Sequence, residues 1–437
     1  MKKVKKKTSR KKKLWEIIFM YASIASIFII ISIYAYRTIY YYRQFNHVEE
    51  AAKFVDILTN KKNIVYFDDG LYKEDDDNYF YYGKNVNNYL MYEGLLWRIV
   101  AIDKTGIKLI SDENLTNLVW GNKTDFSSSV IYNWLNNNDS LKNIRDDEKT
   151  IDSNWCNSGI DITKYECKDN TSAKVGLITT TDFIKAGSDK SYLNNGTYYW
   201  TINTDNDKLA YYVHTEGGIN NQVGEGDLLY SYGVRPVIYL DKNLDYISGD
   251  GSRNNPYVVT NSMTTSLKTA FIGSYISYNK YNFRVLEQGE GYTKLILDGY
   301  LSSDNNEAVK VTYDKIKNSL DTFIKKFNSD DLGKAKFNKT EYNNGNNYDY
   351  AKTYDTYDGS IGLPIVGDLF INDYKGCWLD TYYNKSQDLI YTTFDNSTLL
   401  ADLASNEDNI RPIIVLKNSL NIIDGKGTKD NPYVIGN

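Results

Sequence analysis

Histidine, cysteine and proline are scarce in this chain: its 437 residues include 2 histidines, 3 cysteines and 5 prolines. Few histidines leave little material for nucleophilic triads, in which the base is usually a histidine. His214 has Glu216 two residues away, on the same face of an expected strand, but a lone histidine beside a Gly-Gly turn seldom has a catalytic role. We therefore predict no catalytic residue.

Signatures of phosphate binding and of paired acids are also missing. Gly224 and Gly226 lack the lysine and the following helix of a phosphate-binding loop. Acidic residues are abundant, but no two of them stand out as the pair that a glycoside hydrolase needs. The sequence predicts no cofactor, and an enzyme is the less favoured class.

The three cysteines are too few for a disulfide framework or a cysteine-rich metal site. Cys156 and Cys167 lie in one loop-like stretch, and we expect them to form a disulfide. Cys377 is left over and is expected to be a buried free thiol. Neither His47 nor His214 has ligand spacing to a cysteine, so no metal site is predicted.

Excess positive charge is missing from most of the chain. Nine lysines and arginines stand before Leu14, and since the total formal charge is −5, the remaining residues carry −14. Contacts with nucleic-acid phosphates need a basic surface. The composition therefore argues against nucleic-acid binding by the main body.

An apolar run from Leu14 to Tyr36 follows the basic segment. It has the length of a helix that crosses a hydrocarbon core of roughly 30 Å, and the positive-inside rule keeps the basic tail cytoplasmic. We therefore expect single-pass anchoring in a cell membrane through Leu14–Tyr36, with the body extracellular. The alternatives are a cleaved signal peptide and a pilin-like leader, but the cleavage or processing residues of both are missing.

Beyond the apolar run, the spacing of apolar residues predicts a helical stalk, and a Ser/Thr/Asn run later separates two modules. The expected domains are a basic cytoplasmic tail over 1–13, a transmembrane helix over 14–36, a helical stalk over 37–63, module one over 64–260, a linker over 261–266 and module two over 267–437.

The longest repeat closes both modules. Residues 233–259 align without a gap on residues 409–435, which lie 176 positions later. Glycines and prolines stay in register, so that Gly249 and Gly251 fall on Gly425 and Gly427. Such a match indicates a duplication.

A second alignment, offset by 186 positions, relates residues 89–115 to residues 275–301. Apolar and β-branched residues around a glycine-containing turn predict strands over 95–102 and 107–111. A helix is expected after Ser127–Ser129, with Ile131, Trp134 and Leu135 on its apolar face. Each module is thus expected to have an α+β fold of hairpin, helix, irregular middle and closing strand.

The repeated ending is best explained as a structural device. Its arginine can pair with a carboxylate or cap carbonyls, and its proline begins a strand where no N–H is needed. The Gly-x-Gly permits a tight reversal, and the Asn-Pro step an extended approach. We assign structural roles to Arg235, Pro236, Arg411 and Pro412. A calcium loop is the alternative, although the EF-hand spacing and its closing glutamate are missing.

Tyrosine is abundant, with 41 residues. Its clusters lie among asparagine, serine and glycine, a composition typical of binding surfaces. Codon usage in an AT-rich genome would produce the same excess. The candidate binding residues are Tyr198, Tyr199, Trp200, Tyr211, Tyr212, Trp378, Tyr382 and Tyr383.

Several short motifs resemble a family of bacterial domains with a WRVL hairpin, a helix ending in WLN and a terminal GVRP strand. The matching residues are Trp97-Arg98-Ile99-Val100, Trp134-Leu135-Asn136, Glu148-Lys149, Trp200 and Gly233-Val234-Arg235-Pro236-Val237. Such domains look similar to the C-type-lectin-like fold shared with formylglycine-generating enzymes. The resemblance implies two tandem C-type-lectin-like modules. It does not extend to enzyme activity, because this chain lacks the cysteine pair of those enzymes.

These observations favour a membrane-anchored bacterial surface protein whose duplicated lectin-like modules bind a glycan, a wall polymer or a surface protein. One alternative is an extracellular enzyme that acts on glycan or cell-wall substrates through carboxylates. Another is a structural, pilin-like surface component.

Overall fold

The computed structural model describes most of the chain. The described residues are 13, 15, 18–22, 25, 26, 29, 31–33, 35–37, 52–138, 141–161, 166–204, 209–222, 231–259, 266–270, 272–303, 307–344, 347–368, 376–394 and 398–436. The predicted linker over 261–266 therefore lies, except for Ser266, outside the described residues.

The chain divides into two compact units, Met1–Ala52 and Lys53–Asn437. In the first unit, the described residues before position 38 are helical. Among all described residues, no helix is both long enough and apolar enough to cross a membrane. The predicted transmembrane helix over 14–36 is therefore wrong, and with it the single-pass cell-membrane placement and the extracellular body. Parts of that range, and residues 38–51 of the predicted stalk, lie outside the described residues.

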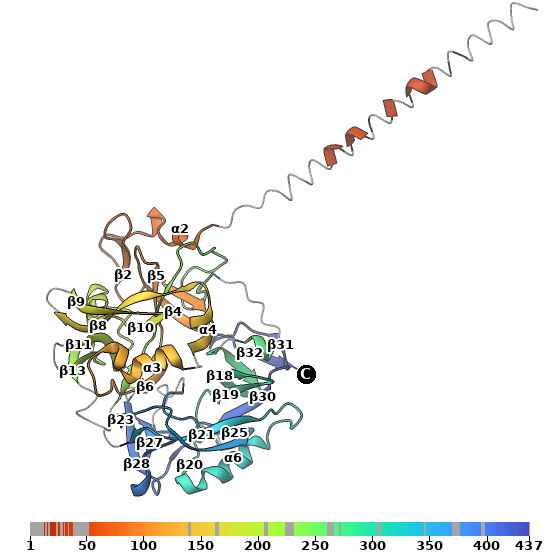
Figure 1. The fold of residues 1–437 in the computed structure, drawn as a ribbon. Helices are drawn as coiled ribbons and strands as arrows, with labels where there is room; N and C mark the ends of the chain where they lie inside the picture. The colour runs from red at the N-terminus through yellow and green to blue at the C-terminus, as the bar shows by residue number, and fades with distance from the viewer. Residues whose placement is uncertain are drawn as a thin grey trace, which may run out of the picture. The chain divides into compact units, whose positions relative to one another are not determined.

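Strands dominate the second unit (Figure 1), so the expected α+β class is also wrong: strands account for 42% and helices for 19% of the structure. The predicted hairpin is confirmed, since β4 spans Leu95–Ile102 and β5 spans Ile107–Ser111. The irregular middle of each module, for which few strands were expected, forms a second sheet instead. Its strands are rich in aromatic and β-branched residues, which favour strands, and β11 (Tyr199–Thr204) is buried along its whole length.

The main sheet of module one has its strands in the order β16-β3-β4-β5-β15-β10, with β1 and β2 continuing from β4, and β7 paired with β15. The additional bounds are β1 (Gly70–Lys73), β2 (Tyr79–Tyr82), β3 (Tyr89–Tyr92), β7 (Thr150–Ile151), β10 (Val175–Gly176), β15 (Val237–Leu240) and β16 (Tyr257–Val258).

The main sheet of module two repeats this order as β32-β17-β18-β19-β30-β25, with β31 beyond β32. Its bounds are β17 (Tyr275–Tyr278), β18 (Tyr281–Gly289), β19 (Tyr292–Leu297), β25 (Ile361–Gly362), β30 (Ile413–Lys417), β31 (Asn421–Asp424) and β32 (Tyr433–Gly436). The register is also repeated: Val237 pairs with Ile110, and the equivalent Ile413 pairs with Ile296. The duplication predicted from the sequence is therefore confirmed at the level of individual residue pairs.

Each module also contains a second five-stranded sheet. In module one the order is β13-β12-β11-β14-β6, and in module two it is β24-β21-β26-β27-β28. The bounds are β6 (Thr116–Leu118), β11 (Tyr199–Thr204), β12 (Ala210–Val213), β13 (Ile219–Gln222), β14 (Tyr232–Val234), β21 (Ala335–Glu341), β24 (Thr353–Gly359), β26 (Trp378–Asn384), β27 (Leu389–Phe394) and β28 (Thr398–Leu403). Smaller pairs join β8 (Ser153–Asp161) with β9 (Glu166–Ala173), β20 (Lys310–Val311) with β29 (Asp408–Asn409), and β22 (Asn343–Asn344) with β23 (Asn347–Tyr348).

Short helices complete the body: α2 (Phe54–Leu58), α3 (Val130–Asn137), α4 (Lys142–Asp146), α5 (Thr180–Lys185) and α6 (Ile316–Ile324). The helix expected after Ser127–Ser129 is confirmed as α3. The hydroxyl of Ser129 accepts a hydrogen bond from the N–H of Tyr132 and so caps its amino end. Ile131, Trp134 and Leu135 are buried, as their spacing predicts.

Each module begins with a segment that pairs with its own ending. The N–H of Phe54 donates to the carbonyl of Leu244 at 2.8 Å, and the N–H of Leu267 donates to the carbonyl of Leu420, the residue equivalent to Leu244, also at 2.8 Å. Phe54 and Leu267 are fully buried. Module one therefore starts at residue 53, inside the range for which a stalk was predicted.

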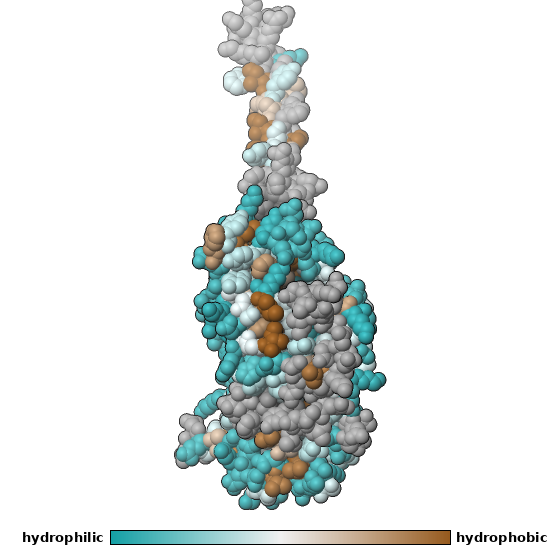
Figure 2. Space-filling model, turned by 90° about the vertical axis from the view of Figure 1, so that its left-hand side faces the viewer, coloured by the Kyte–Doolittle hydropathy of each residue, from teal (hydrophilic) through white to brown (hydrophobic). Residues whose placement is uncertain are grey.

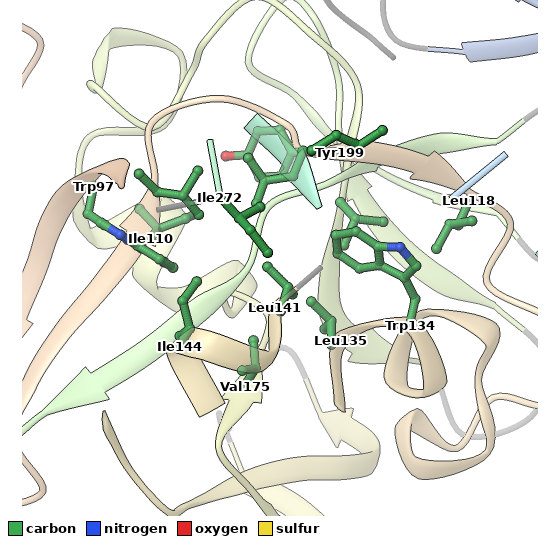
Figure 3. Packing of buried hydrophobic residues seen from close by; sticks show 14 of the residues in the cluster. Trp97, Ile110, Leu118, Trp134, Leu135, Leu141, Ile144, Val175, Tyr199 and Ile272 are labelled. Carbon is green, nitrogen blue, oxygen red and sulfur yellow. The ribbon is translucent and has the colours of Figure 1, made fainter. Parts of the chain in front are cut away.

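One hydrophobic cluster runs through both modules. Figure 3 shows Ile272 of module two among residues of module one that include Ile110 and Tyr199. Hydrogen bonds also join the modules: Trp134 Nε1 donates to the carbonyl of Gly367 at 2.6 Å, and Tyr342 Oη accepts from the N–H of Val119 at 2.7 Å.

Candidate functional site

Half of the predicted aromatic binding residues belong to the core. Tyr199, Trp200, Tyr212 and Trp378 are all buried. Trp200 Nε1 donates to the carbonyl of Leu118 at 2.8 Å, and Trp378 Nε1 donates to the carbonyl of Val311 at 2.8 Å. Their polar atoms are thus satisfied inside the protein, and a ligand cannot reach these side chains in this conformation.

The space beside Trp200, where an enzyme would need a pocket with paired acids, is filled by aromatic rings. The ring of Tyr232 lies 4.9 Å from that of Trp200, and those of Trp120 and Tyr212 lie 5.7 and 6.0 Å from it. The structure therefore gives no support to a catalytic site at this place.

The other four aromatic candidates, Tyr198, Tyr211, Tyr382 and Tyr383, are half-buried. Tyr198 Oη lies 3.1 Å from Nε2 of His214, so the only histidine of the second unit is engaged by a tyrosine. The ring of Tyr382 packs edge-on against that of Tyr354, with the ring centres 5.7 Å apart and the planes at 62°. These residues come from strands of the two second sheets and are not brought together in one site.

The arginines and prolines of the repeated endings lie at equivalent positions in the two modules. Arg235 is buried, and its guanidinium donates to the carbonyls of Ser111, Leu193 and Asp112. Arg411 is buried too, and its Nε donates to the carbonyl of Leu297, the counterpart of Ser111, at 2.6 Å.

Pro236 and Pro412 accept hydrogen bonds from the N–H groups of Ser111 and Leu297. A proline at this position loses no sheet hydrogen bond, because only its carbonyl is needed. The four residues thus hold the closing strand against the hairpin.

Cys156 and Cys167 are joined in a disulfide between β8 and β9. Cys377 is a free, buried cysteine, and burial raises the pKa of its thiol to about 12. The thiol therefore stays protonated and unreactive at neutral pH.

The two repeated endings meet at one groove, which we name the junction groove. It has a volume of about 540 Å³ and is lined by residues 248–258 of module one, here called latch one, and residues 425–433 of module two, here called latch two. A smaller hollow of about 50 Å³ adjoins it and shares Arg253 and Thr428 with it. The volume is in the usual range for small-molecule sites.

Glycines with positive φ shape both latches. Gly251 has φ +77° and Gly427 has φ +74°. A Cβ atom at either position would lie 2.4 Å from the ring of Tyr257 or Tyr433. The carbonyl of Gly251 accepts the N–H of Tyr89, and the carbonyl of Gly427 accepts that of Tyr275, so the latches are fixed to β3 and β17.

Each latch places a basic residue over a tyrosine that also stacks on a buried arginine. In module one, Tyr89 lies between Arg98, whose Cζ is 3.8 Å from the ring centre, and Arg253, at 5.7 Å. In module two, Arg284 lies 4.5 Å and Lys429 lies 6.0 Å from the ring centre of Tyr275. The stack of module two lines the adjoining hollow, and Arg253 of the first stack lines both the hollow and the groove.

Carboxylates of module one bind arginines of both modules. Arg253 Nη1 lies 2.8 Å from Oδ2 of Asp112, and its Nη2 lies 3.8 Å from Oε1 of Glu113. The other oxygen of Glu113 lies 3.5 Å from Nη1 of Arg284, which belongs to module two. Glu113 therefore links the two modules in the hollow that adjoins the groove.

Glu93 stands at the rim of the groove in a left-handed conformation, with φ +48°. Such a conformation is unfavourable for glutamate and is often found at functional sites. Burial, the charge of Asp147 and a hydrogen bond with Asp147 raise the pKa of Glu93 to about 7, and Lys149 opposes this shift. Glu93 can therefore donate a hydrogen bond near neutral pH.

No metal centre is visible in the described part of the chain: histidine, cysteine, aspartate and glutamate nowhere form a group of three with suitable geometry. Two aspartates of the first repeated ending that could serve a calcium loop have other partners. Asp245 binds Lys53 at 2.7 Å, and Asp250 accepts the N–H of Ser252.

Sequence reasoning missed the junction groove because it assigned the repeated endings a structural role. The signal that could have revealed it lies in the exposed polar residues that the copies do not share, Arg253 against Lys429 and Asn254 against Asp430. Structural positions in the same latches, such as the glycines, are identical in both copies.

Comparison with known proteins finds no match to this chain among protein-family models, curated proteins or solved structures. The resemblance to the WRVL/GVRP domain family remains a prediction from the sequence.

Proposed function

We propose that this is a binding protein that holds its ligand in the junction groove. The observation that carries the proposal is that both copies of the repeated ending line one groove of about 540 Å³. A duplicated element that converges on one cavity gives a ligand contacts from two modules at once. The ligand classes are those expected from the sequence: a glycan, a wall polymer or a protein segment.

On the face of the body in Figure 2, hydrophilic residues predominate and apolar ones form small separate groups. Broad apolar patches are the usual mark of protein–protein docking. The polar residues of the groove suit a ligand that is bound through hydrogen bonds.

The test is retention of the full-length chain on immobilised glycans, anionic polymers and peptides. Thr428→Trp would fill the groove and should abolish retention, whereas Asn318→Trp, on the exposed face of α6, should not change it. Thermal unfolding would show that both variants are folded. Retention of Thr428→Trp at the wild-type level would contradict the proposal, as would a wild-type chain that binds nothing in the panel.

A further inference from the structure

We infer that the ligand of the junction groove is an uncharged saccharide chain that contacts both latches. This inference rests on the binding function proposed above and narrows its ligand class. Three observations carry it: the balance of charge in the groove, the internal pairing of its arginines, and the polar groups that remain available.

The formal charges that line the groove and its adjoining hollow nearly cancel: since Glu93 is partly protonated near neutral pH, at most one positive charge is left unbalanced. The basic residues are Arg253, Arg284, Lys426 and Lys429, and the acidic residues are Glu93, Asp112, Glu113 and Asp430. A site for phosphate or carboxylate needs cationic groups in excess, because the ligand's charge must be compensated when it loses water. The excess in this groove is at most one charge.

The arginines are also already engaged. Asp112 forms a salt bridge with Arg253 at 2.8 Å, and Glu113 forms salt bridges with both Arg253 and Arg284. An anionic ligand would have to displace these carboxylates from their partners. An uncharged ligand can lie over the ion pairs without breaking them.

The remaining polar groups match hydroxyls. Asn254 of latch one and Asn431 of latch two are exposed carboxamides that line the groove. Each carboxamide has two donor hydrogens and one acceptor oxygen, and a saccharide hydroxyl both donates and accepts. Thr428 Oγ1 accepts the N–H of Asn431 at 3.2 Å, which leaves its own hydrogen to donate.

Apolar surface for the C–H face of a sugar ring lies in the same groove. Met91 and Tyr433 line it, and both are half-buried. Tyrosine offers a flat face whose hydroxyl stays in water. The groove therefore combines amides from both modules with an aromatic face, in surroundings whose charges nearly cancel.

The experiment is calorimetric titration of the full-length chain with uncharged hexasaccharides (β-1,4-glucan, α-1,4-glucan, β-1,4-mannan and β-1,4-linked N-acetylglucosamine) and with polyphosphate, polygalacturonate and polyglutamate. We expect one of the uncharged probes to bind with an affinity that changes less than twofold between about 50 and about 500 mM NaCl. The double variant Asn254→Ala/Asn431→Ala should weaken this binding roughly tenfold. The control Asn318→Ala should leave it unchanged.

The outcomes separate the two proposals. Tighter binding of an anionic probe that weakens with salt and with Thr428→Trp would overturn the saccharide inference and leave the groove as the binding site. Saccharide binding that is insensitive to both the double variant and Thr428→Trp would overturn both. Since salt dependence is measured on the wild-type chain, this part of the test does not depend on the variants.

Discussion

Asp182 and Asp368 occupy equivalent positions in the two modules, yet their surroundings differ. Asp182 accepts a hydrogen bond from Lys108 Nζ at 2.5 Å. Burial alone would raise the pKa of this carboxyl, but Lys108 and the hydrogen bonds from Thr179 together lower it. In module two, Lys294 takes the place of Lys108 and binds Glu287 instead, at 2.7 Å. Burial then raises the pKa of Asp368 to about 7, although the N–H of Ile365 opposes the shift.

We predict opposite pH dependences for the two aspartates. Because the folded-state pKa of Asp368 is raised, its protonated form stabilises the fold at low pH, and this contribution is lost as pH rises from about 4 to about 7. The free energy of unfolding of Asp368→Asn should therefore exceed that of the wild type by roughly 1–3 kcal/mol between pH 5 and pH 8. Denaturant unfolding across this range measures the difference.

Asp182→Asn is the matched comparison. The folded-state pKa of Asp182 is lowered, so its contribution is present above the unfolded pKa and is lost as pH falls. This variant should be destabilised by roughly 3–5 kcal/mol at pH 7, because it leaves Lys108 buried without its partner, and by less at pH 3. Parallel pH profiles for the two variants would show that the aspartates do not differ as described.

The latch glycines give a second prediction at this scale. Gly251→Ala and Gly427→Ala should each destabilise the protein by roughly 2–4 kcal/mol, because the added Cβ lies 2.4 Å from a tyrosine ring and the backbone has positive φ. Gly291→Ala has a similar φ of +79° but open space around it, so it should cost only about 1 kcal/mol. Equal losses in all three variants would rule out the steric contact as the cause.

At the scale of elements, the hairpin and α3 could be predicted because their signals are local. Apolar and β-branched residues on either side of a glycine-containing turn define β4 and β5, and Ser129 precedes the apolar spacing of α3. The second sheets could not be predicted in this way, because their strands carry polar and aromatic residues whose burial depends on distant partners. Trp200 looked like a binding residue for this reason and is part of the core.

The sequence does not predict the first segment of each module, because a single buried apolar residue anchors that segment to the module. Phe54 and Leu267 share no motif, and only their hydrogen bonds to Leu244 and Leu420 show that they are equivalent. The apolar spacing around Phe54 was therefore interpreted as part of a helical stalk.

A stability measurement separates a stalk from a module element. Phe54→Ala should lower the free energy of unfolding by roughly 3–5 kcal/mol, because Phe54 is fully buried and its ring packs 5.2 Å from that of Tyr257. Asp56→Ala, on the exposed side of α2, should change it by less than about 0.5 kcal/mol. A neutral Phe54→Ala would place this segment outside the folded module.

At the scale of the whole second unit, the two modules should unfold together. They share one hydrophobic cluster and are joined by the Trp134–Gly367 and Tyr342–Val119 hydrogen bonds. We therefore expect a single calorimetric transition for residues 53–437 within the full chain. Two resolved transitions would show that the modules are independent.

Tyr342→Phe tests the contact between the modules. The variant leaves the buried N–H of Val119 without its acceptor. It should therefore lower the free energy of unfolding by roughly 1–3 kcal/mol. Tyr383→Phe, a half-buried tyrosine of β26, serves as the control and should be nearly neutral.

The central claim is that the two latches form one binding site. Hydrogen–deuterium exchange of the full-length chain, with and without the tightest-binding uncharged hexasaccharide, tests it most directly. The account predicts slower exchange in both latches, residues 248–258 and 425–433, and little change in β11 and β26. Protection confined to one latch, or centred on the aromatic strands β11 and β26, would contradict it.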